Sequence, residues 1–332
     1  MDSPKETDDN PPETIEVVLD KRGDVIFELG GIGQPLTRLR VSSKVLTLAS
    51  PVFDAMFNHG FAEGQNLSSA SPRVVFLRED HSESMTILCQ ICHIRNQDVP
   101  KTLTVDLLAE LTILCDKYDC VSAIQPWSVL WARELLPRTR EPGSEKLLFI
   151  AYRLELPMIF FQLTETLVKD RESKVNFEIA CAGQDSLPTR IVDDIEENRA
   201  ERRQRLVNAI INGITPILKG SKATSHHCVR ELVSEYFFSL AKVDLWPLLE
   251  GVSRYSSSEI FQKLDSLTAT NEDNCECDYS SNSCFAVSQS ASLVHTLKEE
   301  IKAIEMSYTG ICLDCSMAGR NSYDSKICRV KH

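Results

Sequence analysis

The most constraining part of this sequence is residues 23–64, where the spacing of apolar residues changes from that of strands to that of helices. Val25–Leu29 and Leu36–Val41 are rich in strand-forming residues, and the second run alternates apolar with polar side chains. Three glycines, at positions 30, 31 and 33, lie between the runs and predict a hairpin. These residues therefore predict a pair of strands that leads directly into helices.

Two short helices are predicted after the hairpin. Ser42 or Ser43 can cap the first helix. Its apolar residues are Val45, Leu46 and Leu48. Ser50 can cap the second helix, and Pro51 occupies the first helical position. We expect this second helix, residues 52–58, to bury its large apolar side chains, which are Val52, Phe53, Met56 and Phe57.

Strand and helix patterns continue to about residue 135. Arg73–Leu77 predicts a short apolar strand of the kind that packs against helices. Apolar residues at helical spacing predict helices at 84–93 and 104–118, and Thr104 can cap the second of them. A further helix is predicted before Pro137. Its apolar residues lie on one face and are Trp127, Leu130, Trp131, Leu135 and Leu136.

The order of these elements and the residues in them resemble the BTB/POZ domain family. The matching motifs are Asp24-Val25, Val41-Ser-Ser-Lys44-Val-Leu46 and Ser50-Pro-Val-Phe53-Asp-Ala-Met56-Phe57. The resemblance implies an α+β fold over residues 15–135, in which a small sheet is capped by helices. Ser43 stands where the family usually has histidine, in a region near the dimer interface of many BTB domains. The fold therefore follows from the resemblance more directly than the dimer geometry does.

Two C-terminal segments extend the resemblance to most of the chain. They are Tyr255-Ser256-Ser257-Ser258 leading into Phe261-Gln262-Lys263-Leu264, and Gly310-Ile311-Cys312-Leu313-Asp314-Cys315. Both look like the C-terminal region of a large group of BTB-domain proteins from filamentous fungi. This group brings no catalytic residues with it, so the resemblance implies a protein-binding role.

The resemblance also implies partners. BTB domains form homodimers or bind other proteins, and many recruit a cullin scaffold of ubiquitin ligases through a hydrophobic-x-Glu turn after the Met-Phe helix. Phe61-Ala62-Glu63 stands there: Phe61 offers an apolar anchor, and Glu63 can fix orientation by a charged hydrogen bond. The alternative is an ordinary turn between a helix and a strand. Two functions follow, a substrate adaptor for a cullin-based ubiquitin ligase and a transcriptional or nuclear regulator that recruits corepressors.

Composition limits the other partners. The chain of 332 residues has a net charge of -12, which opposes nonspecific attraction to nucleic acid and to anionic membranes. Residues 1–13 lack the basic start and apolar run of a signal peptide, and no apolar run reaches the roughly 18 residues of a membrane helix. We expect a soluble intracellular protein, cytoplasmic or nuclear or both, with reduced thiols. The acidic charge and the lack of a Cys-Cys-His-His finger favour the adaptor.

The sequence divides into five regions. Residues 1–14 are expected to be a disordered acidic N-terminus, followed by the BTB-like region at 15–135. Two prolines and a glycine mark a linker at 136–144. A mostly α-helical domain is expected at 145–270, and a cysteine-rich tail with one helix at 271–332. Helices in the C-terminal region are predicted at 145–156, 158–169, 194–218, 225–241 and 257–267.

The tail carries the clearest metal-binding pattern, because six of the twelve cysteines lie between positions 275 and 328. Cys312 and Cys315 have the short spacing with which two thiolates hold one zinc ion. A helix at 288–306 would bridge them to the other cysteines as a hairpin. The predicted zinc ligands are Cys275, Cys277, Cys284, Cys312 and Cys315. The alternative is a mobile tail with free thiols.

No catalytic signature is recognisable, and we predict that the chain is not an enzyme. Cys89-Gln-Ile-Cys92-His93 has the spacing of covalent haem attachment. Its cysteines, however, lie on the apolar stripe of a predicted helix, where cysteine behaves as a small hydrophobe. Residues that can act as nucleophiles or metal ligands also occur at Cys120 and in the run His226-His227-Cys228. They do not belong to a recognisable catalytic signature, so packing roles are favoured for them.

Overall fold

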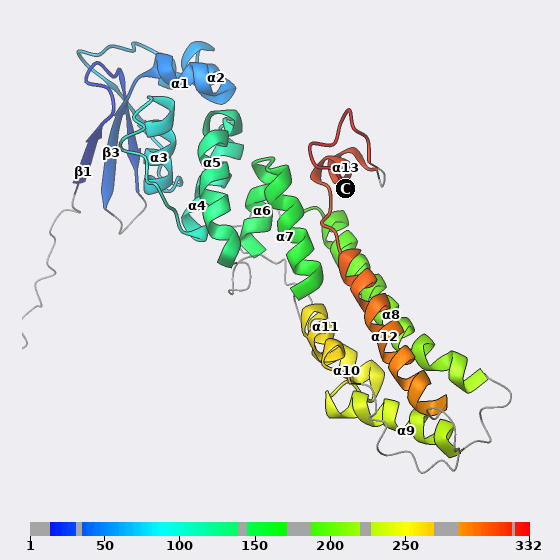
Figure 1. Ribbon diagram of the computed structural model, residues 1–332. Coiled ribbons are helices and arrows are strands. Elements are labelled where there is room, and N and C mark those ends of the chain that lie inside the picture. The colour runs from blue at the N-terminus through cyan, green and yellow to red at the C-terminus, as the bar shows by residue number, and fades with distance from the viewer. Residues whose placement is uncertain are drawn as a thin grey trace, which may run out of the picture. The chain divides into compact units, whose positions relative to one another are not determined.

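The computed structural model describes residues 14–30, 35–138, 145–170, 187–219, 227–268, 285–320 and 323–332. The described residues up to Ile159 form one compact unit, and those from Phe160 onward form another. We call them unit 1 and unit 2 (Figure 1). Unit 1 holds a small four-stranded sheet with helices, and unit 2 is helical in its described residues, so the predicted α+β class is confirmed.

The sheet of unit 1 contains the predicted hairpin. Its strands are β1 (Thr14–Val18), β2 (Val25–Leu29), β3 (Leu36–Val41) and β4 (Arg73–Phe76), in the order β1-β3-β2-β4. β2 and β3 are antiparallel, with Val25 opposite Val41. The outer strands β1 and β4 run parallel to β3 and β2, respectively. β2 and β3 are therefore the central strands, and their alternating apolar residues lie in the core.

The helices of unit 1 follow the predicted order. They are α1 (Ser43–Ala49), α2 (Pro51–Asn58), η1 (Ala62–Gly64), α3 (Ser82–Cys92), α4 (Val105–Lys117), α5 (Val121–Leu135), η2 (Leu136–Arg138) and α6 (Glu145–Arg153). α3 packs between the sheet and α4, and α4 packs on α6 (Figure 1). Thr104 caps α4 as predicted, because its side chain accepts a hydrogen bond from the Leu107 N–H.

An aromatic stack forms the centre of unit 1. The Phe53 ring on α2 lies 5.7 Å from that of Phe27 on β2, 6.2 Å from that of Phe57 and 4.4 Å from that of Tyr118, measured between centroids. Ser50 fixes the start of α2, since its hydroxyl accepts from the Phe53 N–H at 3.0 Å and donates to the Tyr118 carbonyl. The predicted Ser50 cap is therefore confirmed, and it also ties α2 to the end of α4.

Two predicted burials in unit 1 are wrong, at Val52 and Met56. Val52 and Met56 are only half-buried, because α2 turns Phe53 and Phe57, four residues apart, toward the sheet. The apolar face predicted before Pro137 is narrower than expected: Leu130 is 56% exposed, since neighbouring residues on a helix point about 100° apart and Trp131 takes the inward direction. The same geometry leaves Leu48 89% exposed while Leu46 is fully buried.

Helix α7 (Pro157–Asp170) crosses the boundary between the units. The predicted linker at 136–144 lies partly in η2 and otherwise outside the described residues. α6 belongs to unit 1, where Lys146 contacts Asp106 at 2.5 Å and Arg153 contacts Asp116 at 3.7 Å. The compact fold of unit 1 therefore extends beyond residue 135 to Ile159.

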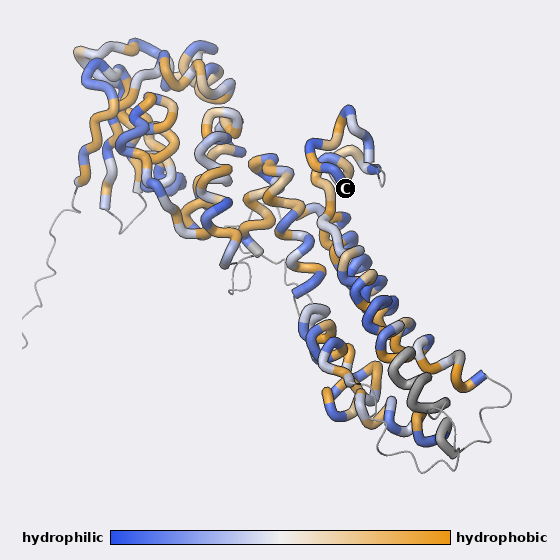
Figure 2. Tube along the Cα trace, in the orientation of Figure 1, coloured by the Kyte–Doolittle hydropathy of each residue, from blue (hydrophilic) through white to orange (hydrophobic). Residues whose placement is uncertain are grey.

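Unit 2 is built around two long helices. Its described helices after α7 are α8 (Thr189–Lys219), α9 (His227–Lys242), α10 (Leu248–Arg254), α11 (Ser257–Asp265), α12 (Phe285–Met306) and α13 (Leu313–Ala318). α8 and α12 lie side by side, and α9 packs on both (Figure 1). The first half of α8 is rich in charged residues and the second half in apolar ones (Figure 2). None of the helices in the described ranges combines the length and apolar character needed to cross a membrane.

Candidate metal centre

Four potential metal ligands converge at the end of unit 2. They are Cys312, Cys315, Cys328 and His332, and their ligand atoms all lie within 4.8 Å of one another. The Cys315 Sγ is 3.5 Å from the Cys328 Sγ and 3.3 Å from the His332 Nε2. Tetrahedral zinc, with Zn–S bonds of about 2.3 Å, places two thiolates about 3.8 Å apart. The group, which we call the Cys3His cluster, is therefore compact enough to hold one metal ion.

The local fold brings the four ligands together by reversing the chain after α13. Cys312 is the N-cap of α13, and Cys315 lies in its first turn. Gly319 ends the helix in the left-handed conformation, with φ of 69°. The N–H of Arg320 then returns to the Cys315 carbonyl at 2.9 Å. Glycine adopts this backbone without strain, so the chain can turn back and present Cys328 and His332 to the two helical cysteines.

A partly buried ion pair fixes the two halves of the cluster in register. Asp314 lies between the two helical cysteines, and Arg329 directly follows Cys328. The Asp314 carboxylate accepts from the Arg329 N–H at 2.7 Å, from Nε at 2.9 Å and from Nη2 at 2.7 Å. Burial alone would raise the pKa of Asp314, but these hydrogen bonds lower it below its usual value. The pair therefore positions both sequence segments that supply ligands.

The thiols of the cluster differ in acidity. Burial and hydrogen bonds with Cys328 and Cys312 raise the pKa of Cys315 to about 12. The pKa of Cys328 is lowered, mainly because its sulfur accepts a hydrogen bond from the Asp324 N–H. Three thiolates this close together would repel one another, so a divalent cation bound among these sulfurs would offset the repulsion and favour loss of the thiol protons.

The cluster is anchored to the rest of unit 2 through the segment between α12 and α13. The Ile311 N–H donates to the Thr164 hydroxyl on α7 at 2.8 Å. The Tyr308 hydroxyl donates to the Ser257 hydroxyl on α11 at 2.9 Å. Arg202 on α8 donates to the Ser307 hydroxyl at 2.6 Å. Contacts with three helices therefore fix the entry to the cluster.

An acidic face of α8 borders the cluster. A cavity of about 630 Å³ is lined on one side by the helix residues Asp194, Glu197, Asn198 and Glu201. Its other side includes Cys312, Cys315 and His332. Arg320 also lines the cavity, so its lining carries both acidic and basic side chains.

The structure brings together two of the five predicted zinc ligands, Cys312 and Cys315. The other three, Cys275, Cys277 and Cys284, lie outside the described residues. The prediction missed Cys328 and His332, although the full spacing, Cys312-x2-Cys315-x12-Cys328-x3-His332, is itself typical of zinc sites. The predicted helix at 288–306 is present as α12.

The predicted partner-docking residues lie at the surface of unit 1. Phe61 is 57% exposed and directly precedes η1, and Glu63 is half-buried within η1. The turn packs closely on α2 at Gly64. A side chain at this position would collide with the Phe57 carbonyl, so the close packing requires glycine. The structure therefore presents Phe61 outward from a well-supported turn.

The haem-like spacing at residues 89–93 has a structural role. The His93 Nδ1 lies 2.8 Å from the Cys89 carbonyl, and its Nε2 accepts from the Ser42 N–H at 3.0 Å. Both ring nitrogens are thus engaged with backbone. Burial raises the pKa of Cys92 to about 12 and keeps the thiol protonated. These residues pack α3 against the start of α1.

Comparisons with known proteins give no match: no protein-family model fits the sequence, and no curated protein is similar to it. The function of the chain must therefore be inferred from its residues and their geometry.

Proposed function

We propose that this chain is a non-enzymatic protein-binding adaptor, in which unit 1 is a BTB/POZ domain and unit 2 is closed by a structural Zn²⁺. The observation that most supports the binding role is the exposure of Phe61. Phe53 and Phe57 on the preceding helix are 1% and 4% exposed, whereas Phe61 is 57% exposed beside Glu63. An outward aromatic side chain on a fixed turn, next to a carboxylate, has the features of an interface anchor.

The partner expected at this turn is a cullin scaffold of a ubiquitin ligase. Changing Phe61 and Glu63 together to alanine is expected to weaken cullin binding at least about tenfold, because an apolar anchor and an orienting charge are both lost. Binding of purified cullin to the full chain, measured by surface plasmon resonance, checks this. Leu48→Ala is the control, since Leu48 is 89% exposed in the same unit. Failure of the wild type to bind, or equal loss in the control, contradicts the cullin proposal.

A homodimer is a second partner proposal, and the edge strand β1 supports it. β1 pairs with β3 on one side, and the other edge is unpaired within the described residues. Ile15 and Val18 on this strand are 49% and 48% exposed. An exposed strand edge with apolar side chains is a site at which another chain can pair.

The zinc proposal rests on the kind and number of ligands. Thiolate and imidazole donors favour zinc over magnesium or calcium, and a Cys3His set is common in structural zinc sites. Four protein ligands leave no coordination position open for a substrate, so the role proposed is structural. The cavity beside the cluster is lined by the carboxylates Asp194, Glu197 and Glu201 and by one arginine, Arg320, and this acidic balance favours the adaptor over a regulator that contacts DNA through this metal site.

Metal analysis of the purified full chain tests the zinc proposal. We expect about one Zn²⁺ per chain in the wild type and a loss of most of it in a Cys328→Ala, His332→Ala double variant. A triple alanine variant of Cys275, Cys277 and Cys284 is expected to keep the metal. Cys92→Ala is the matched control because this thiol lies in unit 1. A folded, metal-free wild type contradicts the zinc proposal, and loss only in the triple variant assigns the metal to the other cysteines.

A further inference from the structure

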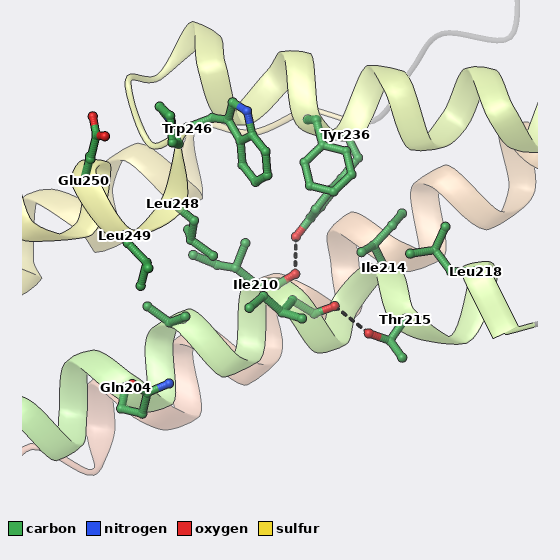
Figure 3. A pocket seen from close by; sticks show the side chains of 14 residues that line it. Gln204, Ile210, Ile214, Thr215, Leu218, Tyr236, Trp246, Leu248, Leu249 and Glu250 are labelled. Atoms are coloured by element: carbon green, nitrogen blue, oxygen red, sulfur yellow. Dashed lines mark hydrogen bonds between the residues drawn. The ribbon is translucent and has the colours of Figure 1, made fainter.

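A second surface of unit 2 has the features of a binding groove. A cavity of about 670 Å³ lies between the second half of α8, the end of α9 and α10 (Figure 3). Its α8 side is formed by Val207, Ile210, Ile211, Ile214 and Leu218. The opposite side is formed by Phe237, Trp246, Pro247, Leu248 and Leu249. We call this cavity the helical groove.

The two hydroxyl groups that line the helical groove already have partners. The Tyr236 hydroxyl donates to the Ile210 carbonyl at 2.7 Å, and the Thr215 hydroxyl donates to the Ile211 carbonyl at 2.8 Å (Figure 3). Because these hydrogen bonds are made within the chain, the interior offers an apolar surface to a ligand. The hydrophobic effect is therefore the main source of affinity available there.

Large apolar side chains also form the rim of the helical groove. Ile211 and Leu218 are 49% and 45% exposed on α8, and Trp246 and Leu249 are 47% and 75% exposed across from them. Large exposed apolar side chains on both sides of a cavity are typical of a protein interaction site. A small molecule inside the cavity would leave most of this rim in water.

The length of the helical groove fits a helix. Its α8 side runs from Gln204 to Leu218, which is about 21 Å at 1.5 Å per residue. A partner helix of about four turns has the same length and can place aliphatic residues at i, i+3, i+4 and i+7 along it.

Charge gives the partner helix a preferred sign at one end. Glu250 and Gln204 lie at the same end of the helical groove, and Glu250 is the carboxylate among its lining residues (Figure 3). Arg254 contacts the Oε2 of Glu250 at 3.4 Å, and the two side chains are 61% and 66% exposed, so the Oε1 of Glu250 remains accessible to a second cation. A basic side chain of a partner can therefore approach Glu250 favourably.

We propose that the helical groove binds an amphipathic helix of a partner protein, with aliphatic anchors in the cavity and a lysine or arginine near Glu250. This site shares no residue with the Cys3His cluster or with the Phe61 turn. Its failure and theirs can therefore be observed separately.

A labelled synthetic peptide tests this proposal on the full chain. The probe is an amphipathic helix of about four turns with leucine at i, i+3, i+4 and i+7 and lysine at its ends, and the comparison peptide carries glutamate instead of lysine. Fluorescence polarisation is expected to show that the wild type binds the lysine peptide about two- to fivefold more tightly. Leu249→Glu is expected to weaken binding about tenfold, and Glu250→Lys to reverse the preference.

The matched control is Phe238→Glu, because Phe238 is 63% exposed on α9 and does not line the helical groove. This variant and Phe61→Ala are expected to bind the lysine peptide as the wild type does. Absence of binding, equal loss in Phe238→Glu, or equal affinity for the two peptides overturns the proposal. If light scattering shows that the wild type is a dimer and that Leu249→Glu is a monomer, the groove binds a second copy of the chain. Displacement of the peptide by palmitate assigns it to a small apolar ligand, and either outcome overturns the proposal.

Discussion

Removal of the metal from zinc-loaded protein with a chelator is expected to lower the free energy of unfolding of unit 2 by about 4 kcal/mol. This is the stabilisation that a ligand provides when its free concentration is about a thousand times its Kd. For a unit of this size, the thermal midpoint falls by about 10 °C. The reason is that the Cys3His cluster links α13 to residues 323–332, and without a cation its thiols lose their common partner. Differential scanning calorimetry with and without chelator measures the shift.

Two variants control this measurement. Cys328→Ala is expected to start at the lower midpoint and to show no further response to chelator. Cys92→Ala is expected to respond as the wild type does, since Cys92 packs within unit 1. The Asp314–Arg329 contacts do not depend on a metal, so unit 2 is not expected to unfold completely after chelation. Trypsin is expected to cleave faster at Lys326, because this residue lies in the segment that the metal would hold against α13. An unchanged midpoint after measured loss of zinc would contradict the structural role.

The elements that sequence predicts best are those whose signals are local. Ser50 and Thr104 each accept a hydrogen bond from an N–H three residues later, so the cap and the helix it starts lie within one short segment. The β2–β3 hairpin is similar, because a short glycine-rich loop leaves one simple way to pair the strands. In these cases a few neighbouring residues determine the structure.

Elements that depend on distant partners or lack a buried face are missed. β1 pairs with β3 across more than twenty residues of chain, and its side chains are mostly exposed, so no alternation marks it as a strand. α10 is only seven residues long and combines the buried Leu248 with the 75% exposed Leu249. A periodicity argument has too few residues to detect a helix of this length.

The metal cluster falls between these cases. Cys312 and Cys315 could be predicted as a pair because three residues on a helix turn bring their thiols together. Cys328 and His332 join them only because Gly319 reverses the chain and Arg329 binds Asp314. The spacing of the four ligands can be read from the sequence. The chain reversal that brings the ligands together depends on tertiary contacts, which the sequence does not show.

The aromatic stack of unit 1 leads to the second large expected effect. Phe53→Ala is expected to destabilise unit 1 by about 3–5 kcal/mol, the usual cost of deleting a buried phenylalanine ring. Phe53 is 1% exposed and stacks on Phe27, Phe57 and Tyr118, so its removal leaves a cavity among three rings. The backbone around it is fixed by the Ser50 cap and by the Tyr118 carbonyl, which limits how far the cavity can collapse.

Urea unfolding followed by tryptophan fluorescence can assign this loss to unit 1. Trp127 and Trp131 lie on α5 in unit 1, and Trp246 lies in unit 2, so a Trp246→Phe background reports on unit 1. Phe61→Ala is the matched control: it deletes the same ring from a 57% exposed position, where about 0.5 kcal/mol or less is expected. Equal loss in the two variants would mean that Phe61 is buried by unit 1 itself. The turn would then be unavailable as a partner anchor, so this single comparison tests both the core and the proposed docking surface.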